Sequence, residues 1–79
     1  MHLNIVSLKG VEFEGEVSSV NLMTTSGEIT VLDNHQPLIT QLTKGQAIVT
    51  KKDGETLNLD ILSGFLEVGM ENRVSILIS

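Results

Sequence analysis

The sequence predicts an all-β protein, a flattened two-sheet β-sandwich of roughly seven to ten short strands. Three observations support this fold class. Apolar residues alternate with polar residues along most of the chain, which is the period of a strand with one buried face. Pairs rich in Gly, Asn or Asp separate these segments at short spacing and mark turns. No stretch of about ten residues keeps a helical period.

The size and composition allow only one domain. The 79 residues support a single small core that buries about 60% of the unfolded chain's surface, so we assign residues 1–79 to one β-sandwich domain. Cysteine is absent, which excludes disulfides and thiolate chemistry. Apolar runs are far shorter than the ~20 residues that cross a bilayer.

The charge balance bears on the class of partner. The net charge is −5, and the only aromatic residues are Phe13 and Phe65. Nucleic-acid binders of this size carry a basic face and stacking aromatics, so we expect no nucleic-acid partner. An acidic domain is not attracted to anionic lipid. We therefore expect membrane contact to be indirect, through protein partners.

The first long alternating segment defines a strand and a bend. In residues 11–17, Glu12, Glu14 and Glu16 alternate with apolar residues or Gly, so the three carboxylates share one face, which must point to solvent. The apolar parity then changes between Val17 and Val20. Because the strand period is two, this change predicts a bulge or bend that carries one long strand from one sheet to the other.

Later segments carry more local predictions. Asp53-Gly54 lies between two alternating runs and predicts a type I′ hairpin turn, in which both central residues have positive φ. Pro37 is placed to start one short helical turn. The final strand, Val74–Ile78, is apolar on nearly both faces, so internal packing or a partner chain must cover it.

Candidate catalytic chemistry is sparse. Asp33, His35 and Glu28 form the only combination that suggests a metal site, but Asp33-Asn34 followed by Pro37 is more typical of a turn, which we favour. No nucleophile stands beside a base, and no glycine-rich loop is present to hold phosphate. We therefore predict no catalytic, cofactor-binding or metal-binding residues, no cofactor and no enzymatic activity.

Three segments together resemble a known family. Residues 27–38, with Gly-Glu followed by His35-Gln36-Pro37-Leu38, are similar to the signature loop of the epsilon subunit of F-type ATP synthases. Residues 11–17 resemble that family's Val-x-Phe-x-Gly-x-Val, and residues 63–68 resemble its Gly-Gly-Phe-x-Glu-Val. With further similarities at residues 42–45 and 72–74, these matches occur in the family's order and are spread over nearly all of the chain.

The resemblance implies a non-catalytic rotor subunit. Such a subunit sits in the central stalk of a proton-translocating ATP synthase, links the gamma subunit to the membrane c-ring, and supports the coupling of ion flow to ATP synthesis. By position, Glu28 corresponds to the c-ring contact, and His35, Thr40 and Ser7 to the gamma-facing surface. The implied location is peripheral, at the cytoplasmic face of the energy-coupling membrane.

The chain departs from the family pattern at several points. Leu22-Met23-Thr24 stands where Leu-Pro-Gly is usual, so this turn must form without proline. Thr30 and Ser63 replace frequent glycines, which are residues able to take positive φ or to approach another backbone closely. Family members often continue into a C-terminal helical hairpin that can bind ATP. We expect that hairpin to be absent from a chain that ends at Ser79, and therefore expect no bound nucleotide.

Two further expectations concern binding. A gamma-type partner requires an exposed aliphatic patch, which we expect near Leu22-Met23 or on the final strand. The alternative function is a free-standing β-sandwich recognition module for a peptide or sugar. The absence of Trp and Tyr counts against this alternative, because such modules rely on aromatic platforms.

Overall fold

The computed structural model describes all residues 1–79 and contains eight strands and no helix. The predicted all-β class and number of strands are confirmed. The strands are β1 (His2–Ser7), β2 (Gly10–Thr24), β3 (Gly27–Leu32), β4 (Leu38–Leu42), β5 (Gly45–Lys51), β6 (Thr56–Ile61), β7 (Gly64–Val68) and β8 (Arg73–Ile78). Because there is no helix, none is long and apolar enough to span a membrane.

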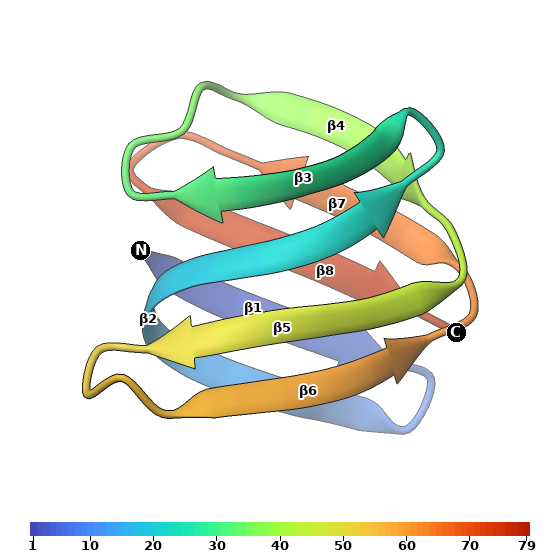
Figure 1. Cartoon of the computed structure of the whole chain (residues 1–79), viewed down its shortest axis with the longest axis horizontal. Helices are drawn as coiled ribbons and strands as arrows, with labels where there is room; N and C mark the ends of the chain where they lie inside the picture. Colours follow the sequence, from blue (N-terminus) through green and yellow to red (C-terminus); the bar gives the residue numbers. More distant parts are fainter.

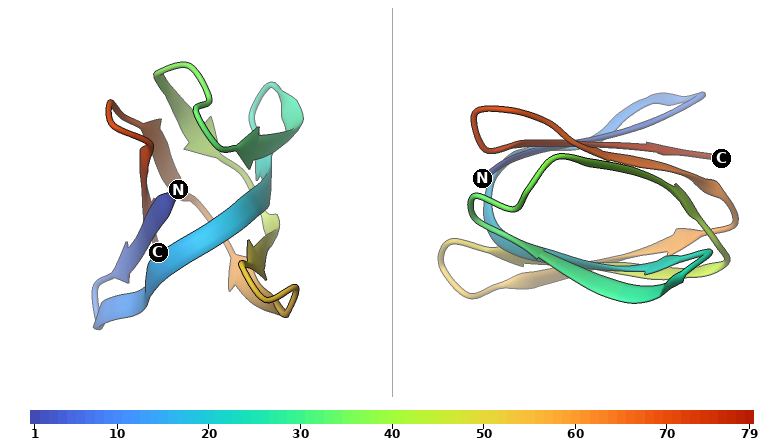
Figure 2. Two further views of the ribbon diagram at one scale, coloured as in Figure 1. Left: turned by 90° about the vertical axis from the view of Figure 1, so that its left-hand side faces the viewer. Right: turned by 90° about the horizontal axis from the view of Figure 1, so that it is seen from above.

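The strands form a flattened sandwich of two layers (Figures 1 and 2). One layer has the order β1-β8-β7-β4, and the other has β3-β2-β5-β6. The strand β2 also pairs with β1 and touches β4 at the single pair Thr24 and Leu42. The two layers are therefore connected by backbone hydrogen bonds through β2 as well as by side-chain packing.

The strand β2 bends between the layers, as the parity change predicted. Its first half pairs antiparallel with β1, with Asn4 opposite Glu14, and its second half pairs with β3 and β5. The β2–β5 register shifts between Val17 and Ser19, which marks an irregularity of the bulge type. Val17 and Val20 consequently both point into the core.

The last strand, β8, lies inside its layer. It pairs parallel with β1 and antiparallel with β7, so internal packing covers it and neither of its edges is free. The parallel pairing places the amino and carboxyl termini at opposite ends of the sandwich (Figure 1). The core between the layers contains fifteen buried apolar residues, namely Met1, Leu3, Ile5, Val17, Val20, Leu22, Val31, Leu42, Ala47, Val49, Ile61, Leu66, Val68, Val74 and Ile76.

Two local predictions are wrong. Only Gly54 has a positive φ in the β5–β6 loop, and the Gly54 N–H donates to the Lys51 carbonyl at 3.0 Å. A turn followed by a left-handed glycine makes a longer hairpin loop than the predicted type I′ turn. No helical turn begins at Pro37, which instead directly precedes β4; its fixed φ near −65° is compatible with the start of a strand.

The substituted positions adopt ordinary geometry. Thr24 lies at the end of β2, and its hydroxyl donates to the Gly27 carbonyl at 2.7 Å and accepts from the Ser26 N–H at 3.1 Å. This side chain closes the β2–β3 turn without a proline. Neither Thr30 nor Ser63 has a positive φ, so a glycine is not required at either position.

Candidate functional site

An exposed apolar patch lies on the outer surface of the β1-β8-β7-β4 layer. Val6, Leu77 and Phe65 stand directly opposite one another on β1, β8 and β7, which places their side chains next to each other. Ile39 on β4 lies two residues further along, opposite Glu67, and Gln41 is the residue opposite Phe65. Ile39 is 73% exposed, Phe65 54% and Leu77 56%. We call Val6, Ile39, Phe65 and Leu77 the apolar patch.

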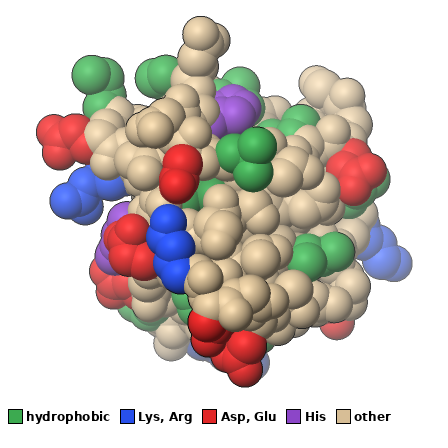
Figure 3. All heavy atoms as spheres, turned by 60° about the vertical axis from the view of Figure 1, so that its left-hand side comes forward, with side chains coloured by type: hydrophobic (Ala, Val, Ile, Leu, Met, Phe, Trp, Pro, Cys, Tyr) green, Lys and Arg blue, Asp and Glu red, His purple; other side chains and the backbone are tan.

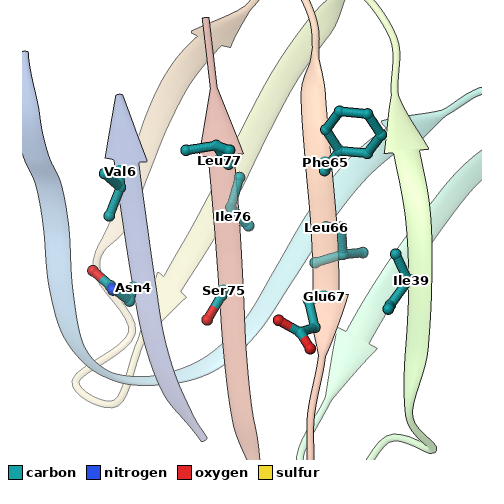
Figure 4. A pocket seen from close by; sticks show the side chains of 9 residues that line it. All are labelled: Asn4, Val6, Ile39, Phe65, Leu66, Glu67, Ser75, Ile76 and Leu77. Carbon is teal, nitrogen blue, oxygen red and sulfur yellow. The ribbon is translucent and has the colours of Figure 1, made fainter. Parts of the chain in front are cut away.

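A polar row runs beside this patch. Asn4, Ser75 and Glu67 are opposed across β1, β8 and β7, and with the patch they line a shallow groove of about 440 Å³ (Figure 4). An apolar row and a polar row therefore cross the same strands side by side. This pattern fits a protein segment that has one apolar and one polar side, because the partner buries the first and forms hydrogen bonds with the second.

A second depression, of about 500 Å³, continues the groove. It shares Ile39 and Glu67 with the groove and extends to Pro37, in the β3–β4 loop, and to Met70, in the β7–β8 turn. Met70 is 76% exposed. Residues 37–39 and 67–70 line this depression, and the two connections that supply Pro37 and Met70 are residues 33–37 and 69–72.

A network of polar contacts joins these two segments. Oδ1 of Asp33 lies 2.6 Å from the Met1 ammonium and 3.4 Å from Nδ2 of Asn72, and Oδ2 lies 3.6 Å from Nζ of Lys52. The N–H of Asn34 donates to Oδ1 of Asn72 at 2.8 Å. We call these five residues the Asp33 network. Hydrogen bonds from the ammonium and then from Asn72 lower the pKa of the Asp33 carboxyl from its ordinary value.

Charged groups of both signs gather around the amino terminus. Both ring nitrogens of His2 lie 3.2 Å from carboxylate oxygens, Nδ1 from Glu16 and Nε2 from Glu14. The predicted outward-facing carboxylates Glu12, Glu14 and Glu16 are all exposed. Figure 3 shows acidic, basic and histidine side chains close together on this side of the molecule. This surface therefore carries charged groups of both signs rather than acidic groups alone.

The predicted partner-binding residues do not form one cluster. Glu28 is exposed at the start of β3, opposite Met23, and the Ser7 hydroxyl at the end of β1 donates to Glu12 at 2.6 Å. Thr40 is half-buried on β4, opposite the buried Leu66, and so belongs to the inner face of that strand. His35 is exposed in the β3–β4 loop, where its N–H donates to the Leu32 carbonyl at 3.2 Å.

The alternative metal site does not assemble. Glu28 and Asp33 lie at opposite ends of β3, about 16 Å apart at the rise of an extended strand. No group of three or more His, Asp or Glu side chains is placed to hold a metal ion. The favoured interpretation of residues 33–37 as a turn agrees with this arrangement.

The expected aliphatic patch is present on the final strand, through Leu77, whereas Leu22 is fully buried. The Asp33 network was not predicted. No sequence signal indicates it, because its members come from the amino terminus and from three separate connections. Phe65 is the only aromatic residue of the groove, which does not favour the alternative of a sugar- or peptide-recognition module.

The comparison with protein families decides the classification. Residues 1–79 match the model described as "ATP synthase, Delta/Epsilon chain, beta-sandwich domain". The chain belongs to this family. Relatives named ATP synthase epsilon chain include one from Endomicrobium trichonymphae, 39% identical over 94% of this chain and 52% of its own length. Another, from Roseiflexus sp. (strain RS-1), is 39% identical over 98% of this chain and 54% of its own length.

Solved structures agree with this membership of the delta/epsilon family. A chain of the Euglena gracilis mitochondrial ATP synthase, from a structure of its OSCP/F1/c-ring, superposes with a TM-score of 0.90 at 26% identity, over 96% of this chain and 48% of that one. A chain of the Tetrahymena thermophila central stalk/c-ring structure gives a TM-score of 0.81 at 13% identity, over 99% of this chain and 62% of that one, and shows the fold alone. The delta/epsilon-type domain spans about half the length of the curated relatives above.

Proposed function

We propose that this domain is a non-catalytic part of the central stalk of a proton-translocating F-type ATP synthase. In this role it links a gamma-type subunit to the membrane c-ring and supports rotary coupling of ion flow to ATP synthesis. Membership of the delta/epsilon family over residues 1–79 supports this role. The structural observation that carries it is the exposed apolar patch with its adjoining polar row.

The geometry fits an adaptor that is held by its neighbours. A close-packed interior has low compressibility and transmits force with little deformation, and β2 joins both layers. An apolar surface in which Ile39, Phe65 and Leu77 are more than half exposed gains stability when a partner covers it. We assign the gamma-type subunit to this patch.

The individual contacts are part of the same proposal. Glu28 is the residue for the c-ring contact, and Ser7, His35 and Thr40 are the residues for the gamma-type subunit. Glu28 and His35 lie toward opposite ends of the sandwich, since β3 separates them. Ser7, at the end of β1, lies at the same end as Glu28, so the proposed contacts with the gamma-type subunit extend along the length of the sandwich. The location we propose is peripheral, at the cytoplasmic face of the membrane, with contact to the bilayer only through protein partners.

The direct test is binding to the gamma-type subunit of the same organism, measured by titration with the wild-type protein and two variants. The variant Leu77→Glu places a charge in the apolar patch, and we expect at least a tenfold loss of affinity, because burying an unpaired carboxylate is costly. Ile48→Glu is the control. Ile48 is 37% exposed on β5 in the opposite layer, and we expect its affinity within about twofold of wild type.

The possible results test the docking face and the proposed function separately. If Ile48→Glu loses affinity and Leu77→Glu does not, the gamma-type subunit binds the layer that contains β5. This result would overturn its assignment to the apolar patch. Absence of binding by the wild-type protein, in reconstitution with the gamma-type subunit and c-ring, overturns the proposed function itself.

A further inference from the structure

The second depression lies over β4 and β7, and residues from two different connections, Pro37 and Met70, bound it at one end. Pro37 belongs to the β3–β4 connection and Met70 to the β7–β8 turn. These segments are more than thirty positions apart in the sequence. The hydrogen bond from the Asn34 N–H to Oδ1 of Asn72, at 2.8 Å, joins them directly.

Both segments contain backbone conformations that need support. Asn34 has a φ of 63°, Glu71 of 61° and Asn72 of 59°. They are the only residues other than glycine with positive φ in the chain. Such conformations cost free energy and persist where surrounding contacts determine them. Asn is among the residues that tolerate this region best, and two of the three positions are Asn.

Asn72 is the centre of the supporting contacts. Its amide oxygen accepts from Asn34, and its amide nitrogen lies 3.4 Å from Oδ1 of Asp33. The Asp33 carboxylate is in turn held by the Met1 ammonium at 2.6 Å and by Lys52 at 3.6 Å. The side chain of Asn72 therefore touches both residues at the beginning of the loop, and charged groups from two further segments fix the orientation of Asp33.

We propose that Asp33 and Asn72 form a latch that holds residues 33–37 against the β7–β8 turn and so positions Pro37 and Met70 for a bound partner. The latch deepens the proposed function, on which it rests for the identity of the partner as a gamma-type subunit. Asp33 and Asn72 are positioning residues: they act through the exposed side chains of the loop and the turn.

The variant Asn72→Gly tests the latch with little change to the backbone. Glycine adopts a positive φ freely, so the turn keeps its conformation while Asn34 and Asp33 lose their partner. The control is Glu71→Gly, in the same turn and with nearly the same φ, because no hydrogen bond or ion pair of the Glu71 side chain is present. Amide hydrogen exchange of Asn34 and His35 reports on the loop in the isolated protein. Affinity for the gamma-type subunit reports on its consequence.

We expect Asn72→Gly to raise the exchange rates of the Asn34 and His35 amides by about tenfold. We expect it to weaken binding by about two- to tenfold, the value of one hydrogen bond. Glu71→Gly changes both by less than twofold. In a His35→Ala background, Asn72→Gly weakens binding by less than it does alone, because coupled residues are not additive.

If the amide exchange rates of Asn34 and His35 are unchanged in Asn72→Gly, the latch is overturned. It is also overturned if the Glu71→Gly control raises these rates by as much as Asn72→Gly does. If Asn72→Gly raises the exchange rates but leaves the affinity for the gamma-type subunit at the wild-type value, the proposal that the latch positions the loop for this partner is overturned. If the wild-type protein binds no gamma-type subunit, the proposed function fails, while hydrogen exchange still decides the latch. If Asn72→Gly does not fold, Asp33→Ala, which removes the oxygen that Asn72 and Met1 contact, replaces it with the same two measurements and the same expected directions.

Discussion

Gly64 on β7 lies directly against the carbonyl group of Leu77 on β8, with no room for a side chain between them. A Cβ at position 64 would stand well inside the van der Waals contact distance of the Leu77 oxygen and 3.1 Å from Cα of Ile78. This close approach of two backbones lies one position from the pair Phe65 and Leu77. The glycine therefore helps to bring these two apolar side chains together on the surface.

The first prediction follows from this contact. Gly64→Ala forces β7 and β8 apart, and we expect a loss of about 1–3 kcal/mol in the free energy of unfolding, as for other overpacked sites. Gly15→Ala is the control. A Cβ at Gly15 would make only ordinary contact, 3.5 Å from the tip of the Phe13 ring. Urea denaturation of both variants measures the difference; equal losses would contradict the argument from backbone contact.

The second prediction concerns pH. The Met1 ammonium and Asn72 lower the pKa of Asp33 in the folded protein, whereas the unfolded chain has the ordinary value of about 3.9. The carboxylate therefore stabilises the fold above the unfolded pKa, and this stabilisation is lost as the pH falls through the lower folded pKa. We expect Asp33→Asn to destabilise the protein at pH 7.

The pH dependence of that difference is the measurement. Thermal unfolding of the wild-type protein and Asp33→Asn, compared from pH 7 down to about pH 2, is expected to show two midpoints that converge in acid. High salt at pH 7 is expected to bring them closer as well, because the Asp33 carboxylate is 47% exposed and screening weakens its ion pairs. If the two midpoints stay equally far apart at every pH, the Asp33 carboxylate does not stabilise the fold through its charge.

The third prediction concerns the core between the layers. Leu66 on β7 is completely buried, and Leu66→Ala removes packed methyl groups and leaves a cavity. We expect a loss of about 2–5 kcal/mol, a large share of the stability of a small domain. Leu62, which is 70% exposed, is the control, and we expect Leu62→Ala to change stability by less than about 0.5 kcal/mol. Denaturant titration that ranks the two variants in the opposite order would show that the core lies elsewhere.

The fourth prediction concerns a polar atom without a partner. The side-chain oxygen of Asn4 is buried and accepts no hydrogen bond, and burying an unpaired acceptor costs about 1–3 kcal/mol. Asn4→Val removes this atom and places a β-branched residue in β1. We expect a higher midpoint of thermal unfolding. Because Asn4 also lines the groove, the same variant is expected to enlarge the exposed apolar surface and to lower solubility. A lower midpoint would mean that this oxygen is satisfied in solution.

Much of the fold follows from patterns that the chain carries locally. Alternation in residues 11–17 predicts a strand with outward carboxylates, and the parity change after Val17 predicts the bend that the β2–β5 register shows. Local chemistry did not predict the type of the Asp53-Gly54 turn, because Asp-Gly fits several loops and the flanking register selects among them. The extended start of β4 at Pro37 is likewise set by pairing with β7.

Local sequence patterns did not predict the features that join segments distant in the chain. The parallel pairing of β1 with β8 brings together the first and the last strand of the chain, and no periodicity encodes which strands become neighbours. Of the apolar patch, Leu77 was predicted from the two-faced final strand, but its alignment with Val6 and Phe65 depends on that pairing. The Asp33 network depends on the same closure, because Met1 reaches Asp33 only once both layers are in place.

The continuity of β2 has a mechanical consequence. This fifteen-residue strand is hydrogen-bonded to β1 on one side of the bend and to β3 and β5 on the other. Sliding one layer past the other would rupture these ladders together, since the covalent chain itself crosses between them. In the proposed central-stalk role, we therefore expect the two layers to turn as one body.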